Sequence, residues 1–476
     1  MLFNSFHFVF FFLIVTSLYY LLPNKYRWLL LLISSCFFYG FFVPIYLLIL
    51  GFTIVVDYFA GILIEKSVGK KRKQFLILSL VANIGILATF KYYNFFNDIL
   101  TSFLHVFDIQ NHVPYLSILL PIGLSFHTFQ AMSYTIEVYR GNQKAEKHFG
   151  LYALYVMFFP QLVAGPIERP QNLIHQFYEK HPFRYENISI GLKLMLWGLL
   201  KKVVIADRLS VYVNAVYNNA EHHSGVTFMV ATVFFAFQIY CDFSGYSDIA
   251  IGTAKVLGYD LMKNFNRPYL SKSVAEFWNR WHISLSTWFK DYVYIPLGGN
   301  RVAIKRIYLN LLIVFIISGF WHGANWTYIA WGASNGVLLI LTMSLKKMEI
   351  PFLKNKKLSL IFTPISIGIT FILICLTWIF FRANSIHDAL MIYQKIGSLE
   401  GSLYIPKIRN EIFSLLYSIV AILALITIEV KQEFFKEKFQ EIQNRYMIKQ
   451  ISYAMILIII VLFGVFDGGQ FIYFQF

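Results

Sequence analysis

The sequence predicts an all-α polytopic membrane protein, on three observations. Hydrophobic residues make up 58% of the 476 residues, whereas they make up about half of an ordinary soluble domain. Mean hydropathy is +0.58. Apolar runs long enough to cross a hydrocarbon core of about 30 Å recur along the whole chain. Because these runs are long and do not alternate with polar residues, helices rather than strands are expected to span the bilayer.

We expect about 11 to 12 transmembrane helices, together with re-entrant or interfacial helices. No internal repeat or long linker interrupts the chain, so residues 1–476 are interpreted as a single domain. Two stretches, 245–258 and 308–342, are harder to divide into spans than the rest. The other spans are placed at 6–22, 28–44, 45–64, 75–92, 117–136, 148–164, 188–206, 225–240, 358–381, 412–430 and 451–466.

Basic loops follow alternate spans, first at Lys25 and Arg27, then at 66–73 and again at 140–147. Lys and Arg collect in cytoplasmic loops, so these loops are predicted to lie inside and the N-terminus outside. The first 22 residues lack a basic n-region and a small-residue cleavage site, and we interpret them as a retained span. The C-terminal residues 467–476 are expected to exit outside. The net charge of +16 is therefore attributed to loop orientation and not to nucleic-acid binding.

The segment 271–299 is too charged to span a membrane. Ser273 and Glu276 fit a capping box, which predicts an amphipathic or re-entrant helix at the cytoplasmic face. His282 is expected on this helix, one turn after Asn279, so that both residues share a face that lines an entry path. An interfacial histidine among tryptophans is at least as good an interpretation from the sequence alone.

The segment 308–342 has basic residues on both flanks, which predicts a hairpin whose turn lies deep in the membrane. His322 lies near this turn, beside Gly319, Gly323 and Asn325, and suits a general base. A histidine held by an interhelical hydrogen bond is the equally weighted alternative. Function is sought here because polar and irregular backbone within a membrane needs a reason.

Other polar residues in apolar runs are interpreted as structural. Asp57, Asp242 and Asp248 are expected to pair with cations or to cap broken helices, and Arg382 is expected to snorkel to the interface. The stretch 165–170 is interpreted as an interfacial turn or anchor. The three cysteines form no CxxC pair, so we expect neither a metal site nor a disulfide framework. Walker A, GxGxxG, HExxH and GxSxG motifs are absent from the sequence.

Several motifs in this order resemble the membrane-bound O-acyltransferase family, in its bacterial branch of alginate O-acetyltransferase membrane subunits. They span nearly the whole chain, and together they are specific where any one aromatic-rich helix is not. They are PIGLSFHTFQAMSYTIEVYRG (121–141), FFPQLVAGPIERP (158–170), FQIYCDFSGYSDIAIG (237–252), FWNRWHISLSTWFKDYVYIPLGGNR (277–301), SGFWHGANWTYIAWGASNG (318–336) and WIFFRA (378–383).

The resemblance implies a ring of helices around a central tunnel and assigns His322 and His282 as the catalytic positions. It implies transfer of an acetyl group from a cytoplasmic thioester, acetyl-coenzyme A, with no permanently bound cofactor. His322 would act as general base, and Asn325, Asn279 and Trp321 are candidates for the substrate path or for stabilising the oxyanion. In this branch, a bacterial inner-membrane protein hands the group to an extracytoplasmic acetyltransferase partner that modifies a polysaccharide.

Three alternatives stay open at this stage. D-alanyl transfer to teichoic acid would need a surface for a carrier protein, and peptidoglycan O-acetylation would use a related two-component system. A polysaccharide or lipid transporter would use its polar residues for binding only. Such a transporter would be expected to show paired, repeated halves, which the sequence lacks.

Overall fold

The computed structural model describes residues 1–117, 121, 123–163, 165–347, 356–406, 409–437 and 446–466. Helices and short connecting segments make up these residues, and no β-strand occurs among them, which confirms the predicted all-α class. Among the described residues, seven helices are long and apolar enough to cross a membrane, and three shorter apolar helices accompany them. The chain is therefore a multi-pass membrane protein. The predicted exit of residues 467–476 lies outside the described residues.

The chain divides into two compact units, Met1–Met195 with Ser247–Met262, and Leu196–Tyr246 with Lys263–Phe476. It passes from one unit to the other within α10 (Tyr185–Leu199) and within α12 (Gly225–Val256). The other helices of the first unit are α1 (Phe6–Leu21), α2 (Asn24–Gly40), α3 (Tyr46–Lys66), α4 (Gly69–Leu87), α5 (Tyr93–His105), α6 (Leu124–Arg140), α7 (Phe149–Met157), α8 (Phe159–Leu162) and α9 (Pro170–Leu173).

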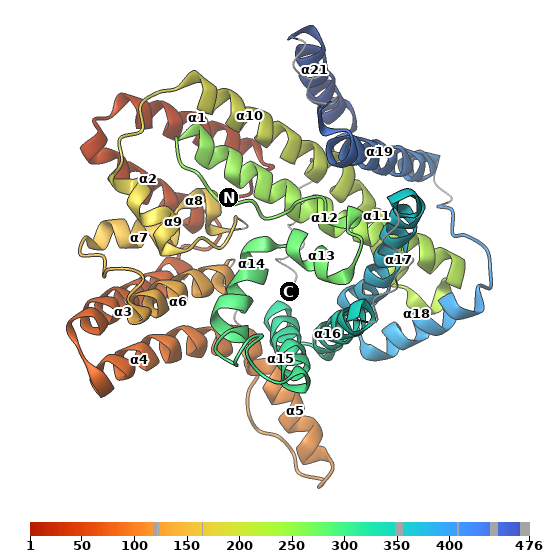
Figure 1. Cartoon of the computed structure of the whole chain (residues 1–476), viewed down its shortest axis with the longest axis horizontal. Helices are drawn as coiled ribbons and strands as arrows, with labels where there is room; N and C mark the ends of the chain where they lie inside the picture. Colours follow the sequence, from red (N-terminus) through yellow and green to blue (C-terminus); the bar gives the residue numbers. More distant parts are fainter. Residues whose placement is uncertain are drawn as a thin grey trace. The chain divides into compact units, whose positions relative to one another are not determined.

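In the first unit, α3, α4 and α6 pack against one another (Figure 1). Asp57 of α3 is fully buried, and its carboxylate accepts hydrogen bonds from Ser79 Oγ at 2.6 Å and Asn83 Nδ2 at 2.8 Å. These contacts fasten α4 to α3 without a cation. They support the structural interpretation of Asp57, although its partners are neutral side chains.

Several predicted spans differ in the structure from the expected single helices. The span 148–164 is broken at Phe158, where ψ is 108°, because Pro160 lacks an N–H and crowds the preceding turn. The stretch 245–258 is no separate span, since α12 runs without a break from Gly225 to Val256. The stretch 165–170 is a turn as expected, but its Glu168 is only 1% exposed and accepts a hydrogen bond from the Met262 N–H.

In the second unit, the segment 308–342 forms the predicted hairpin of α15 (Ile304–His322) and α16 (Trp326–Lys347) (Figure 1). Glycine lets the two helices approach closely, because a Cβ on Gly319 would lie 2.2 Å from the Tyr328 carbonyl oxygen. The other helices of this unit are α11 (Asp207–Tyr217), α13 (Val274–Arg280), α14 (Ile283–Phe289), α17 (Lys356–Arg382), α18 (Ile386–Ser398), α19 (Arg409–Phe434) and α21 (Tyr446–Phe463).

A buried ion cluster lies where α10 continues as a π-helix, Leu200–Ala206. The Lys202 ammonium contacts Asp207 Oδ1 at 2.7 Å and Asp242 Oδ1 at 2.6 Å, and all three side chains are less than 8% exposed. Neighbouring Lys201 is also buried and donates to Ser244 Oγ at 2.9 Å. The expected cation partner of Asp242 is therefore present. Both lysines lie in the π-helix, and their side chains point inward.

Candidate active site

His322 is the last residue of α15 and is 5% exposed. Its imidazole meets the indole of Trp331 edge to face, with ring centroids 5.0 Å apart, and also contacts Phe381 at 5.5 Å and Trp321 at 4.8 Å. The chain turns at Gly323, where a Cβ would overlap the Tyr328 ring at 2.1 Å. The hairpin thus holds His322 in an aromatic wall at the point where the two helices meet.

A cavity of about 490 Å³ adjoins this wall. Gly323, which follows the histidine, and Phe381, which contacts its ring, both line the cavity together with Tyr328. Its volume falls within the roughly 300–1,000 Å³ typical of small-molecule sites. Its remaining lining is mostly polar and comes from α11, α12, the hairpin turn and the α17–α18 connection: Asn214, Asn218, Gln238, Ala324, Asn325, Thr327, Arg382, Ala383 and Asn384.

Arg382 lines this cavity and has hydrogen-bond partners that the sequence did not indicate, while its expected snorkelling to the interface stays a prediction. Its Nη2 donates to Asn214 Oδ1 at 2.7 Å and to Asn218 Oδ1 at 3.0 Å. The guanidinium carbon lies 5.3 Å from the centroid of the Tyr217 ring. These contacts draw the side chain toward α11, because two amide oxygens and an aromatic face replace part of its hydration.

Asn325 has a structural contact that the sequence did not indicate. Its Oδ1 accepts from the Thr327 N–H at 3.0 Å, which caps the first turn of α16. Its Nδ2 reaches the Asn384 carbonyl oxygen only at 3.5 Å, at the limit of a hydrogen bond. The amide nitrogen is thus the part of Asn325 with capacity to donate to a ligand.

His282 lies at a break between two helices, so the predicted continuous helix through it is wrong. Its φ of 42° is left-handed, and α13 ends before it while α14 begins after it. His282 is 1% exposed and therefore does not share an open face with Asn279, which is exposed on α13. The predicted cap is present, since Ser273 Oγ accepts from the Glu276 N–H at 3.2 Å.

Asn264 accounts for this break, because it accepts hydrogen bonds that a continuous helix would form within its own backbone. Its backbone carbonyl accepts from the Ile283 N–H at 2.9 Å, and its Oδ1 lies 3.0 Å from His282 Nδ1. Ser284 donates to the same Oδ1. Burial lowers the pKa of His282 to about 3, so the imidazole stays neutral at physiological pH.

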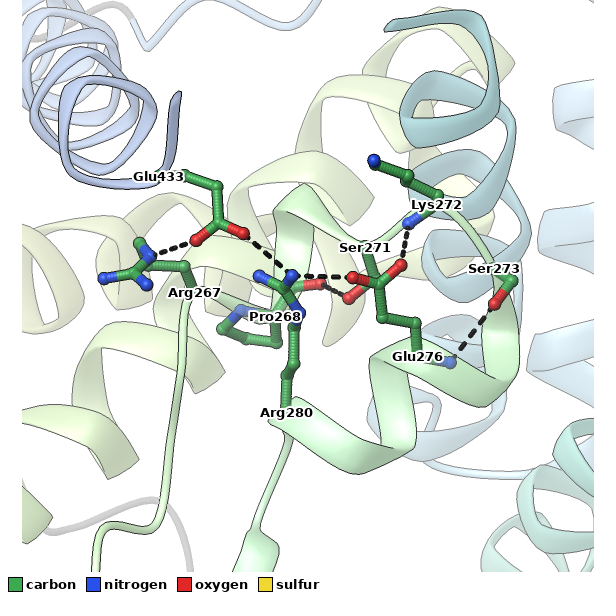
Figure 2. A network of polar contacts seen from close by, with 8 residues as sticks. All are labelled: Arg267, Pro268, Ser271, Lys272, Ser273, Glu276, Arg280 and Glu433. Carbon is green, nitrogen blue, oxygen red and sulfur yellow. Dashed lines mark hydrogen bonds and ion pairs between the residues drawn. The ribbon is translucent and has the colours of Figure 1, made fainter. Parts of the chain in front are cut away.

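A polar network connects the segment 267–280, which leads up to His282, to α19 (Figure 2). Glu433 accepts from Arg267 Nε at 2.7 Å and from Arg280 Nη2 at 2.8 Å. Arg280 also contacts Glu276 at 2.6 Å, and the Asn266 N–H donates to the Arg280 carbonyl oxygen at 2.9 Å. One carboxylate therefore bridges the segment before α13 and the residue two positions before His282.

The two histidines belong to one aromatic cluster. Phe265 stacks on His282 at 6.4 Å and meets Trp281 at 5.1 Å. Trp281 contacts Trp378 at 5.1 Å, which in turn contacts Trp331 at 5.7 Å, the ring that faces His322. A substitution at His282 can thus reach His322 through packing. Among the described residues no group of His, Cys, Asp and Glu is arranged to hold a metal ion.

Sequence reasoning missed the polar cavity wall. Asn214 and Asn218 are four residues apart at the end of α11, and this spacing places both on one helix face. That spacing was the available signal for Asn214 and Asn218, whereas Gln238 lies in an apolar run with nothing to mark it.

The sequence is similar to those of known membrane-bound acyltransferases. Residues 147–382 match the model of the MBOAT, membrane-bound O-acyltransferase family. A "Probable alginate O-acetylase" of Pseudomonas aeruginosa is 40% identical over 401 residues, covering 84% of this chain and 75% of the relative. A "Peptidoglycan O-acetyltransferase" of Helicobacter pylori is 37% identical, covering 84% and 80%. A "Teichoic acid D-alanyltransferase" of Streptococcus thermophilus is 31% identical, covering 50% and 60%.

Proposed function

Because the chain belongs to the membrane-bound O-acyltransferase family, we propose that it moves an acetyl group from a cytoplasmic donor for O-acetylation of an extracytoplasmic polysaccharide. The relatives that support acetyl transfer match more of the chain than the D-alanyltransferase does, at 84% against 50%. The observation that carries the proposal is His322, buried at the turn of a membrane hairpin beside a polar cavity.

In the proposed reaction His322 accepts the proton of an acceptor hydroxyl. The hydroxyl oxygen then attacks the carbonyl carbon of the acetyl thioester, a new C–O bond forms, and the C–S bond breaks. The leaving thiolate takes up the proton that His322 held, so the histidine returns neutral. The Asn325 amide nitrogen is a candidate donor to the oxyanion, and Trp321 contributes to the wall that confines the substrates. Asn279, exposed on α13, is retained only as a candidate for the outer part of the donor path.

Acetyl-coenzyme A is proposed as donor, and an extracytoplasmic acetyltransferase as the partner that receives the group. The proposed location is the bacterial inner membrane with the N-terminus outside. The basic flanks of the hairpin favour a cytoplasmic position for its open end. A helix of 19 residues such as α15 is long enough, at about 1.5 Å per residue, to carry the turn and His322 toward the opposite face.

The test is the acetyl ester content of purified surface polysaccharide from cells that carry wild type or His322→Ala at matched membrane levels. We expect His322→Ala to abolish acetylation while the polymer is still exported. The exposed His387 on α18 gives a control, and His387→Ala should acetylate normally. Unchanged acetylation in His322→Ala would rule out the proposed base, and loss of export would favour a transporter.

Peptidoglycan is the second candidate acceptor. It rests on the Helicobacter pylori relative, whose identity and coverage are close to those of the alginate relatives. Acetyl ester measurement on purified peptidoglycan from the same cells separates the two acceptors.

A further inference from the structure

Resting on the proposed acetyl transfer, we propose that Asn264 is a positioning residue, which fixes the buried His282 with its ring proton on Nδ1. His282 then takes part in the transfer as a hydrogen-bond acceptor through Nε2, and not as a donor to the oxyanion. The assignment rests on the orientation of the Asn264 amide, on the protonation of the imidazole and on the packing of its ring.

The orientation of the Asn264 amide follows from its contacts with Ser284. The Ser284 backbone N–H donates to Asn264 Oδ1 at 3.2 Å, and the Ser284 hydroxyl donates to the same atom at 2.9 Å. A backbone N–H only donates, so the atom that it meets is the amide oxygen and not the NH₂ group. Asn264 is 1% exposed and Ser284 is fully buried, so solvent does not compete for this oxygen.

The same oxygen determines which ring nitrogen of His282 carries the proton. His282 Nδ1 lies 3.0 Å from Asn264 Oδ1. An amide oxygen only accepts, so Nδ1 is the donor and bears the hydrogen. Burial lowers the pKa of His282 to about 3, so the imidazole carries a single ring proton at physiological pH. Nε2 therefore keeps its lone pair, which can accept a hydrogen bond but cannot donate one.

The ring of His282 is held in one orientation by two aromatic side chains. Phe243 meets it edge to face with ring centroids 4.6 Å apart, and Phe265 stacks on it at 6.4 Å. A half-turn of the imidazole would place a ring carbon at Asn264 Oδ1 and lose a hydrogen bond in a buried site. The Asn264 carbonyl oxygen also accepts from the Ile283 N–H at 2.9 Å, so this residue fixes the backbone and the ring together.

The first measurement is the ¹⁵N NMR spectrum of the full chain in lipid nanodiscs, grown with ¹⁵N-labelled histidine. Ring nitrogens with and without a proton give separate signals, and those of His282 are identified by their loss in His282→Gln. We expect the proton on Nδ1 in wild type. Asn264→Leu removes the acceptor but keeps the backbone carbonyl, and it should change the ratio of the two tautomers toward Nε2–H by about 10- to 100-fold, as expected for a buried N–H that loses its acceptor. A proton on Nε2 in wild type would overturn the assignment, whether or not Asn264→Leu folds.

Two further variants separate control of the tautomer from folding of the segment. Asn264→Asp keeps an oxygen at the Oδ1 position and should keep the proton on Nδ1. Its spectrum is recorded at pH 8, because a nearby carboxylate raises the pKa of His282 and favours the charged ring at lower pH. Ser286→Ala is the matched control, since it removes another hydrogen bond across the same helix break, from Ser286 Oγ to the Trp281 carbonyl oxygen at 3.2 Å. It should leave the proton on Nδ1, and a shift as large as that in Asn264→Leu would overturn the role of Asn264.

Acetylation tests the acceptor role of Nε2. The measured quantity is the rate at which acetyl esters accumulate on surface polysaccharide, at matched membrane levels. We expect this rate to fall by about 10- to 100-fold in Asn264→Leu, as for other residues that orient a functional histidine, and by less in Asn264→Asp. A wild-type rate in Asn264→Leu, with the His282 proton moved to Nε2, would overturn the acceptor role.

The NMR result does not depend on acetyl transfer, so the two proposals can fail separately. If His322→Ala abolishes acetylation while wild-type His282 carries its proton on Nε2, the proposed function stands and this inference fails. If wild type acetylates no polymer although its Nδ1 carries the proton and Asn264→Leu moves it, the proposed function fails and positioning by Asn264 stands.

Discussion

Replacement of Glu433 by glutamine should loosen the segment that carries His282. The carboxylate accepts one charged hydrogen bond from Arg267 and one from Arg280, at 2.7 and 2.8 Å. Such bonds contribute about 1.5–3 kcal/mol each. Because the three side chains are 17–28% exposed, solvent screening reduces the sum, and we expect a local loss of about 2 kcal/mol. That loss corresponds to about 30-fold more frequent opening.

Hydrogen exchange of two amides reports this opening. The Asn266 N–H donates to the Arg280 carbonyl oxygen and the Ile283 N–H to that of Asn264, both at 2.9 Å. Both amides should exchange about 30-fold faster in Glu433→Gln, and acetylation should fall. Glu437→Gln, an exposed site four residues further on, is the control. Unchanged exchange in Glu433→Gln would show that the network does not hold the segment.

Three further predictions concern stability, each measured by thermal unfolding of the purified protein. Lys202→Met removes the ammonium shared by two buried carboxylates and should lower the free energy of unfolding by about 3–5 kcal/mol, whereas Lys255→Met, at a surface pair, should lower it by less than about 1 kcal/mol. Gly319→Ala should lower the free energy of unfolding by about 1–3 kcal/mol, because the added Cβ overlaps with backbone atoms. Gly368→Ala, which has open space around it, should leave that free energy unchanged. Burial raises the pKa of Glu168 from 4.5 to about 7. Protonation of this carboxyl therefore stabilises the fold below pH 4.5, and that contribution is lost as pH rises through 7. Glu168→Gln should unfold at a higher temperature than wild type at pH 8 and at the same temperature at pH 4. An equal difference in unfolding temperature at both pH values would show that Glu168 does not change protonation between them.

The hairpin around His322 could be predicted from the sequence because its signals are local. Basic residues flank an apolar stretch, and small residues mark the turn, so charge and glycine placement were sufficient to find it. The capping pair of Ser273 and Glu276 was recognisable for the same reason. Family motifs then singled out His322 and His282 from twelve histidines in the chain.

The break at His282 could not be predicted, because its cause lies 18 residues away in Asn264. The residues 274–289 fit a continuous helix by their sequence alone. The left-handed backbone of His282 results from hydrogen bonds to a distant part of the chain. Two of the expected spans are interrupted for a related reason. Phe158 and the π-helix at 200–206 interrupt apolar runs that composition alone reads as continuous. The contacts of Arg382 could not be predicted either, because its amide partners at α11 are distant in sequence.

The surroundings of His322 differ on its two sides, and this difference bears on how transfer competes with hydrolysis. The rings of Trp331 and Trp321 fill one side, and indole rings admit no water to a thioester held there. The polar cavity next to Phe381 lies on the other side and is lined by Arg382 and Gln238 among others. In the proposed reaction the acceptor hydroxyl would therefore approach His322 from the side of the polar cavity, while the indole rings keep water away from the thioester on the other side.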